Sequence, residues 1–228
     1  HFTIADAKRG DIGNTSTQYA KAFFEKLPFD SITVAPYMGR DSIEPFLQFE
    51  GKYAILLALT SNMGAYDFQT LNTVDRSLYE TVIATSRTWK GAERLMYVLG
   101  ATKTDHLASI RALAPNSFFL VPGVGAQGGD LASVFHAAAN EDVGLLVNSS
   151  RSIIFASSGD DYADAARTAA MDLQQQMKKL LYCFIILHIC IRRPKLGSLL
   201  CMGQGGARRF GLSSCESFQN ISMYYCSI

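Results

Sequence analysis

The chain has 228 residues, of which 48% are hydrophobic and 18% are charged. This length and apolar content suit a globular protein with one large buried core. The formal net charge is +1 and no block of like charges occurs, which excludes the basic stripe of a nucleic-acid-binding protein and leaves a small molecule as the expected partner.

Short apolar runs alternate with longer amphipathic segments, an order typical of repeated βα units around a parallel sheet. The predicted strands are residues 2–5, 32–35, 54–59, 95–100, 118–121 and 145–148. The predicted helices are residues 17–27, 41–49, 78–89, 105–113, 131–139 and 162–181. These six units predict an α/β fold, a (β/α)8 barrel with two units missing. Because the chain opens inside a strand, we expect the first two units to be the missing ones.

The end of the chain differs in composition from the rest. All five cysteines fall within residues 183–228, which hold five Lys and Arg residues against one Glu. Their spacing matches no zinc signature, and a first part without cysteine favours a cytoplasmic protein. We therefore divide the chain into a partial barrel, residues 1–181, and a cysteine-rich tail, residues 182–228. The composition of the tail suggests translation in a wrong frame or past a lost stop codon.

The most apolar run, residues 180–191, is shorter than the roughly 20 residues that cross a bilayer as a helix. No membrane partner is therefore expected.

Asp6 and Lys8 follow the first predicted strand. Residues two apart in a strand point to the same face, so the two charges are expected to lie together at the carboxyl end of the sheet, where barrels bind their ligands. A structural ion pair is the alternative, because such a pattern occurs by composition in about a few per cent of chains.

Three other features have competing interpretations. Arg151 follows a strand end and suits bidentate phosphate binding, or it caps a helix. Ser61 contacts a ligand or caps the helix after it. The spacing Gly123-x-Gly125-x-x-Gly128 matches a dinucleotide fingerprint. That fingerprint belongs after a first strand, however, whereas this one follows Pro122 and the fifth predicted strand, so we reject a dinucleotide site.

The segment Asp6-Ala7-Lys8-Arg9-Gly10-Asp11-Ile12, followed by Thr15, resembles the motif on the third barrel strand of orotidine 5'-phosphate decarboxylases. Three later segments resemble family loops in the same order: residues 60–65 the pyrimidine loop, 122–130 the phosphate and lid loop, and 148–152 the phosphate-binding arginine turn. The form of these motifs is similar to the longer bacterial subtype. The resemblance covers about residues 2–181.

This resemblance implies the roles of the site residues. Lys8 protonates C6 of the pyrimidine as carbon dioxide leaves, and Asp6 lies beside the substrate carboxylate. Asp11 and Thr15 reach the neighbouring site of a homodimer. Ser61 contacts the base, while Gln127 and Arg151 bind the phosphate.

The resemblance implies no metal and no cofactor. It also implies a further aspartate and lysine on the first two barrel strands, which the present sequence does not contain. Two alternatives remain open: an inactive barrel fragment that still binds phosphate ligands, and a related barrel enzyme acting on sugar phosphates, often with magnesium.

Overall fold

The computed structural model describes residues 1–125 and 128–192. Its contacts divide the chain into two units, of which one comprises Phe2–Ser152 and is called the sheet body here. The described part of the other unit comprises His1 and residues 153–192.

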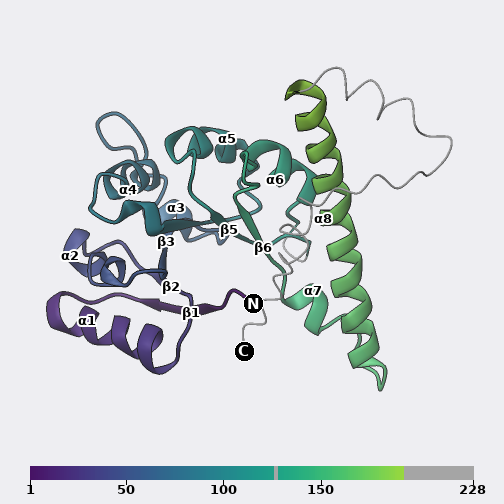
Figure 1. The fold of residues 1–228 in the computed structure, drawn as a ribbon, viewed down its shortest axis with the longest axis horizontal. Coiled ribbons are helices and arrows are strands. Elements are labelled where there is room, and N and C mark those ends of the chain that lie inside the picture. Colours follow the sequence, from purple (N-terminus) through teal and green to yellow (C-terminus); the bar gives the residue numbers. More distant parts are fainter. Residues whose placement is uncertain (126–127, 193–228) are drawn as a thin grey trace. The chain divides into compact units, whose positions relative to one another are not determined.

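The sheet body contains one six-stranded parallel sheet (Figure 1). Its strands are β1 (Ile4–Arg9), β2 (Ser31–Val34), β3 (Tyr53–Leu59), β4 (Leu95–Leu99), β5 (Phe119–Pro122) and β6 (Leu145–Asn148). Each strand pairs with the next one in the sequence. All six predicted strands are thus present, and six consecutive units of a (β/α)8 barrel confirm the predicted fold class.

The two faces of the sheet carry alternate residues of each strand. Tyr97 of β4 points toward α4 (Leu78–Ser86), because its hydroxyl lies 2.9 Å from that of Ser86. Its neighbours Met96 and Val98 belong to a cluster on the opposite face, together with residues of β1, β3, β5 and β6. This alternation explains why β3, β4 and β5 are apolar throughout, since both faces of a barrel sheet are buried.

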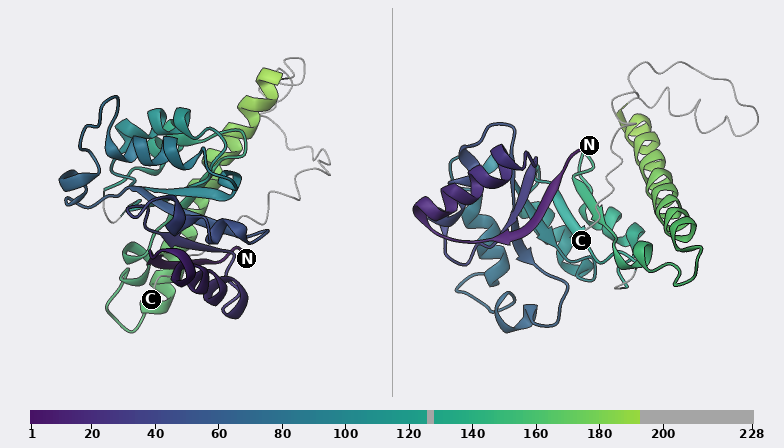
Figure 2. Two further views of the ribbon diagram at one scale, coloured as in Figure 1. Left: turned by 90° about the vertical axis from the view of Figure 1, so that its left-hand side faces the viewer. Right: turned by 90° about the horizontal axis from the view of Figure 1, so that it is seen from below.

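Helices follow the strands of the sheet body, as Figures 1 and 2 show. The longer ones are α1 (Gly13–Lys21), which continues as the π-helical η1 (Ala22–Lys26), α4, α5 (Thr104–Leu113) and α6 (Leu131–Ala138). The short ones are α2 (Arg40–Ile43), α3 (Ala65–Phe68) and the 3-10 turns η2 (Phe46–Gln48) and η3 (Ala92–Arg94).

The prediction of one continuous helix over residues 41–49 is wrong. The structure has α2 and η2 instead, with Pro45 between them. Proline has no backbone N–H and its ring clashes with the preceding turn, so an α-helix does not continue through it.

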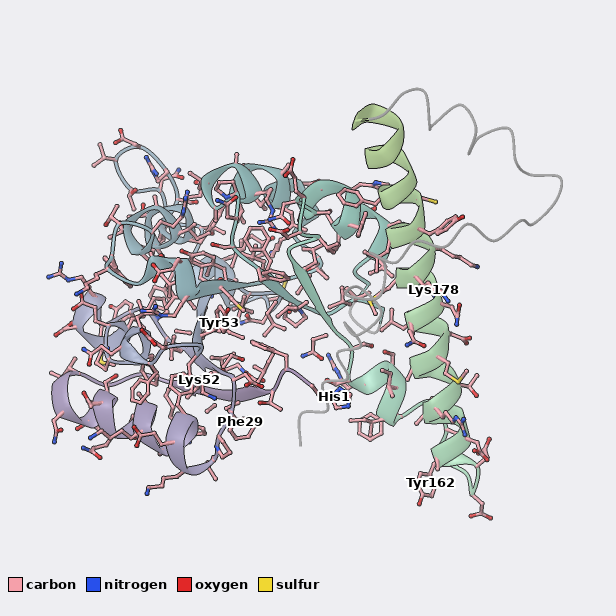
Figure 3. The ribbon with its side chains drawn as sticks, in the orientation of Figure 1. His1, Phe29, Lys52, Tyr53, Tyr162 and Lys178 are labelled. Carbon is pink, nitrogen blue, oxygen red and sulfur yellow. The ribbon has the colours of Figure 1, made fainter. Side chains whose placement is uncertain are left out.

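At the amino ends of β1, β2 and β3, polar contacts link the segments that lead into the strands. Lys52, just before β3, donates a hydrogen bond of 2.8 Å to the carbonyl of Phe29 (Figure 3). Asp30 accepts hydrogen bonds from the backbone and side chain of Thr3, both of 2.7 Å. Burial by itself raises the pKa of Asp30, but these hydrogen bonds and the charge of Lys52 outweigh it and lower the pKa.

The described part of the second unit consists of the end of α7 (Arg151–Ile154) and of α8 (Tyr162–Arg192). Helix α8 extends beyond the predicted end at residue 181, so the predicted boundary between barrel and tail lies inside a helix. Within the part of the chain that the structure describes, no helix combines the length and apolar character needed to cross a membrane.

Candidate active site

Strand β1 is interrupted by a bulge at Asp6, Ala7 and Lys8. Ala5 pairs with Ile32 and Arg9 pairs with Val34, so these three residues lie opposite the single residue Thr33 of β2. Lys8 has a φ of 45°, a left-handed conformation that residues other than glycine rarely adopt. Such backbone outliers cluster at functional sites, where the surrounding structure stabilises them.

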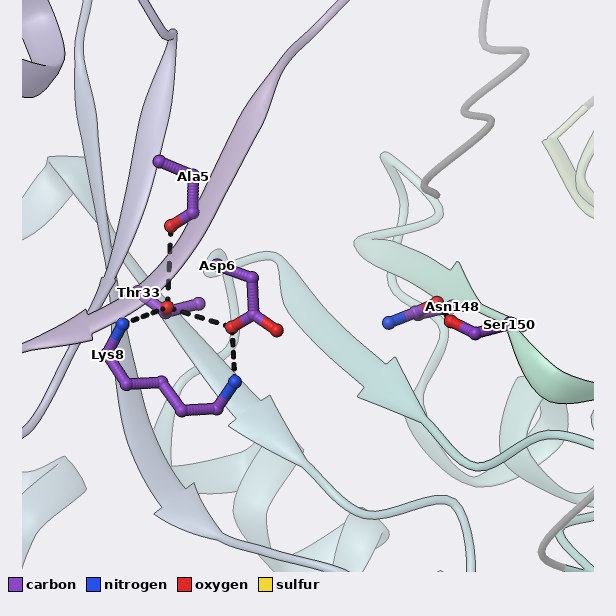
Figure 4. A network of polar contacts seen from close by, with 6 residues as sticks. All are labelled: Ala5, Asp6, Lys8, Thr33, Asn148 and Ser150. Atoms are coloured by element: carbon purple, nitrogen blue, oxygen red, sulfur yellow. Dashed lines mark hydrogen bonds and ion pairs between the residues drawn. The ribbon is translucent and has the colours of Figure 1, made fainter. Parts of the chain in front are cut away.

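The bulge brings the two predicted charges into contact. Lys8 Nζ lies 2.5 Å from Asp6 Oδ1 (Figure 4), and the Lys8 side chain is 54% exposed against 26% for Asp6. The expected pairing is therefore present. The regular strand geometry from which it was predicted is wrong, because the left-handed turn at Lys8 breaks the alternation of β1.

Arg9 and Asp11 follow the bulge and have contacts of their own. The Arg9 guanidinium lies over the rings of Tyr19 and Phe23 on the α1 side, at 5.4 and 5.9 Å from their centroids. Asp11 is half-buried and accepts a 2.8 Å hydrogen bond from the Ile12 amide. Thr15, in the first turns of α1, is exposed. Within residues 1–125 and 128–192, neither Asp11 nor Thr15 forms a hydrogen bond or ion pair with Asp6 or Lys8.

The loop after β3 carries Ser61 and is fixed by the side chain of Gln69. Gln69 Oε1 accepts a 2.8 Å hydrogen bond from the Thr60 amide, and Gln69 Nε2 donates a 2.9 Å hydrogen bond to the Thr60 hydroxyl. Gly100, the residue after β4, packs against this loop. A Cβ atom at position 100 would lie 2.8 Å from the backbone of Ser61, so only glycine permits this close approach.

The loop after β5 is a tight glycine turn. Gly123, Gly125 and Gly128 all have positive φ angles, and the Gly125 amide donates a 3.0 Å hydrogen bond to the carbonyl of Gly129. A Cβ atom on Gly129 would lie 2.4 Å from that of Ala101, so this loop is held directly against the end of β4. Gln127, the predicted phosphate ligand of this loop, lies outside the described residues.

Asp130 ends this loop and caps α6. Its carboxylate accepts a 2.7 Å hydrogen bond from the Ser133 amide and a 2.6 Å hydrogen bond from the Ser133 hydroxyl. The Ser133 hydroxyl is the largest of the causes that lower the pKa of Asp130, and the amides of Ser133 and Ala132 and the charge of His136 add to it, against the opposing effect of burial. The loop therefore runs into a helix start with an ionised cap.

The turn after β6 carries Arg151 and borders the glycine loop. Arg151 is exposed at the first position of α7. The hydroxyls of Ser149 and Ser152 lie 2.5 Å apart, and Ser152 Oγ is 3.8 Å from where a Cβ on Gly125 would be. The two segments expected to hold phosphate are therefore neighbours.

The strand order decides against the dinucleotide fingerprint. In a doubly wound nucleotide-binding sheet, the order of the strands reverses at the ligand site. In this sheet the strands follow one another from β1 to β6 in sequence order. The glycine loop follows β5 and adjoins no such reversal.

Two residues that hold the site together were not predicted. Thr33 bonds both charged residues of the bulge, and Gln69 fixes the Ser61 loop. The position of Thr33 between the apolar residues Ile32 and Val34 of a short strand is a signal that could have pointed to it. Gln69 has no such signal, because its role depends on how its helix folds back on Thr60.

Residues 1–168 match the family model described as "Orotidine 5'-phosphate decarboxylase / HUMPS family". A protein of Flavobacterium johnsoniae named orotidine 5'-phosphate decarboxylase is 62% identical over 180 residues, which are 79% of this chain and 66% of that protein. One of Bacteroides fragilis with the same name is 54% identical over 181 residues, again 79% of this chain and 66% of that protein.

Solved structures agree with the sequence comparisons. The structure described as Leishmania donovani OMP decarboxylase has a TM-score of 0.69 at 36% identity, covering 78% of this chain and 68% of that one. A UMP synthase structure from the same organism has a TM-score of 0.66 at 41% identity, covering 73% of this chain and 37% of that one. This chain spans 66% of the length of the Flavobacterium and Bacteroides proteins.

Proposed function

The chain belongs to the orotidine 5'-phosphate decarboxylase / HUMPS family, and we propose that it carries a site for converting orotidine 5'-phosphate to uridine 5'-phosphate. This reaction is a step of pyrimidine biosynthesis and a carboxy-lyase reaction that uses no cofactor. The contact between Lys8 and Asp6 at the carboxyl end of β1 carries the proposal.

The chemistry requires a cation at the reacting carbon. When the bond from C6 to the carboxylate breaks, its electron pair stays on C6 and carbon dioxide leaves. The Lys8 ammonium group first stabilises the negative charge that develops on C6. It then gives its proton to C6, which leaves a neutral amine. A cation held in place before the reaction stabilises such charge without reorganising. Asp6 holds that ammonium group and lies beside the substrate carboxylate.

The other predicted residues bind the remainder of the nucleotide. Ser61 contacts the pyrimidine, and Gln127 and Arg151 bind the phosphate. Arg151 and the glycine loop adjoin through Ser152 and Gly125, which supports a shared phosphate site. Binding energy from the remote phosphate then helps to order the reacting end of the substrate.

A homodimer belongs to this proposal, with Asp11 and Thr15 reaching the neighbouring site. Exposed apolar side chains in the loops after β1, β2 and β3 support it. They are Ile12, Tyr37, Met38 and Met63. Exposed apolar patches of this kind mark surfaces for protein partners.

We also propose that residues 1–181 form the decarboxylase part and that the tail, residues 182–228, takes no part in the reaction. The family match ends at residue 168, which supports this division. A cytoplasmic location goes with the proposed reaction and substrate.

Replacing Lys8 tests the proposed function. Lys8→Ala is expected to lower the turnover of orotidine 5'-phosphate by at least about a thousandfold, since the proton donor is lost. Binding of uridine 5'-phosphate is expected to change less. Turnover is measured by chromatography of substrate and product, and binding by calorimetry. Lys21→Ala, an exposed lysine at the end of α1, is the matched control and keeps its activity.

Unchanged turnover in Lys8→Ala contradicts the assigned mechanism. An unmodified chain that binds uridine 5'-phosphate without turnover supports the inactive fragment instead. Activity that disappears with a chelator and returns with magnesium supports the related sugar-phosphate enzyme.

A further inference from the structure

Thr33 of β2 lies opposite the bulge in β1. Its side chain is fully buried, and it is the one residue of β2 opposite Asp6, Ala7 and Lys8. Its hydroxyl oxygen accepts a 2.9 Å hydrogen bond from the Lys8 amide and lies 3.0 Å from Asp6 Oδ1 (Figure 4). Asn148 and Ser150, drawn in the same figure, lie apart from this network.

The number of protons on the hydroxyl restricts its contacts. A threonine hydroxyl has one proton to donate and two lone pairs to accept with. Because the Lys8 amide already donates to it, the proton is free to point toward Asp6 Oδ1 at 3.0 Å or the Ala5 carbonyl at 3.4 Å. The nearer and charged acceptor is preferred, because hydrogen bonds to a carboxylate are the stronger ones.

The two bonds act on both members of the charged pair. One fixes the backbone of Lys8, whose left-handed conformation needs support from the surrounding structure. The other fixes the same carboxylate oxygen that contacts Lys8 Nζ. The Thr33 hydroxyl therefore fixes the position of the Lys8 backbone and also the position of the carboxylate that the Lys8 ammonium group contacts.

We propose that Thr33 is a positioning residue for the reaction: its buried hydroxyl holds the β1 bulge and the Asp6 carboxylate so that the Lys8 ammonium group has one orientation. The catalytic part of this inference rests on the proposed function. The structural part does not, and the two are tested separately.

The test compares three variants of the full chain. Thr33→Val keeps the shape of the side chain and removes the hydroxyl, whereas Thr33→Ser keeps the hydroxyl. Ser31→Ala is the matched control, because Ser31 is a fully buried residue of the same strand. Its hydroxyl donates to the Thr3 carbonyl at 3.1 Å and has no contact with Asp6 or Lys8 among the described residues. Thr33→Ala replaces Thr33→Val if the valine variant does not fold.

The first measurement is hydrogen exchange of the Lys8 backbone amide, followed by NMR. Thr33→Val is expected to speed this exchange about tenfold, the effect of losing one hydrogen bond. The amides of Ile32 and Val34 are expected to keep their rates. Thr33→Ser restores slow exchange, and Ser31→Ala leaves Lys8 unaffected. Unchanged Lys8 exchange in Thr33→Val, or equal acceleration in Ser31→Ala, overturns the inference.

The second measurement is turnover. Thr33→Val is expected to lower kcat for orotidine 5'-phosphate about tenfold or more with a smaller change in KM, because the lost bond orients the proton donor rather than binding the substrate. Thr33→Ser recovers most of kcat. Equal kcat in Thr33→Val and the unmodified chain refutes the positioning role. Absence of turnover in the unmodified chain contradicts the proposed function instead, and the Lys8 exchange then decides the structural inference alone.

Discussion

At the scale of single residues, the Arg111 side chain joins several segments of the sheet body. From α5 its guanidinium donates to the carbonyls of Ala138 at 2.7 Å and Gly144 at 3.0 Å, and to three carbonyls of the loop before β5. It also lies 3.7 Å from the ring centroid of Phe119. Burial lowers the pKa of Arg111 to about 10, so the group is still charged at neutral pH.

Arg111→Lys is expected to destabilise the protein by about 2 kcal/mol, because an ammonium group has three donors and lacks the planar fork that reaches carbonyls from several segments. Urea denaturation at neutral pH measures the loss as a lower midpoint. Arg76→Lys, in an exposed loop, serves as the control and should leave the midpoint unchanged. If both variants unfold at the same urea concentration as the unmodified chain, Arg111 does not have this role.

At the scale of elements, local chemistry sets where several helices begin and end. The start of α4 is an example: the Glu80 carboxylate accepts a 2.6 Å hydrogen bond from the Ser77 hydroxyl and a 2.9 Å hydrogen bond from the Ser77 amide. The Ser77 hydroxyl is the main cause that lowers the pKa of Glu80 from its ordinary value of 4.5. Burial opposes this effect, while the Ser77 amide and the charges of His106 and Arg76 add to it.

Ser77→Ala is expected to destabilise the protein by about 1 kcal/mol at pH 7. A carboxylate with a lowered pKa in the folded state stabilises the fold above its unfolded value of 4.5, and this contribution disappears as the pH falls through the folded value. The difference between variant and unmodified chain should therefore shrink in acid. Thermal unfolding between pH 7 and pH 3 measures it, with Thr85→Ala in the same helix as the control. A difference independent of pH contradicts the assignment.

At the scale of the whole molecule, the carboxyl edge of the sheet body combines charge with exposed apolar surface. Tyr37 is 91% exposed and Met63 is 80% exposed, in the loops after β2 and β3. Leu27, which precedes β2 at the opposite edge, is 55% exposed. If the proposed dimer forms, the first two side chains become buried and Leu27 remains in solvent.

Tyr37→Glu is therefore expected to convert a dimer into a monomer, because burying an unpaired carboxylate in an apolar interface costs several kcal/mol. Sedimentation velocity measures the change. Leu27→Glu introduces the same charge at the other edge and should remain dimeric. A dimer that persists in Tyr37→Glu and dissociates in Leu27→Glu would place the interface at the opposite edge.

The sequence by itself determined the alternation of strands and helices, because burial on both faces of a parallel sheet requires continuous apolar runs that are visible in one dimension. All six strands were predicted on this basis, whereas the Asp6–Lys8 pair was predicted from the alternation of side chains along a strand. Residues that end a parallel strand lie at one edge of the sheet whatever the details of packing, so the location of the candidate site followed as well.

Only the tertiary structure decided how the pair is held. The bulge opposite Thr33 and the left-handed Lys8 depend on the register between β1 and β2, and register is a relation between residues far apart in the sequence. The close approach of Gly100 to Ser61 and the contacts of Arg111 with the Ala138 and Gly144 carbonyls have the same origin. Local patterns contain no information on such distances, since they arise only when separate segments pack together.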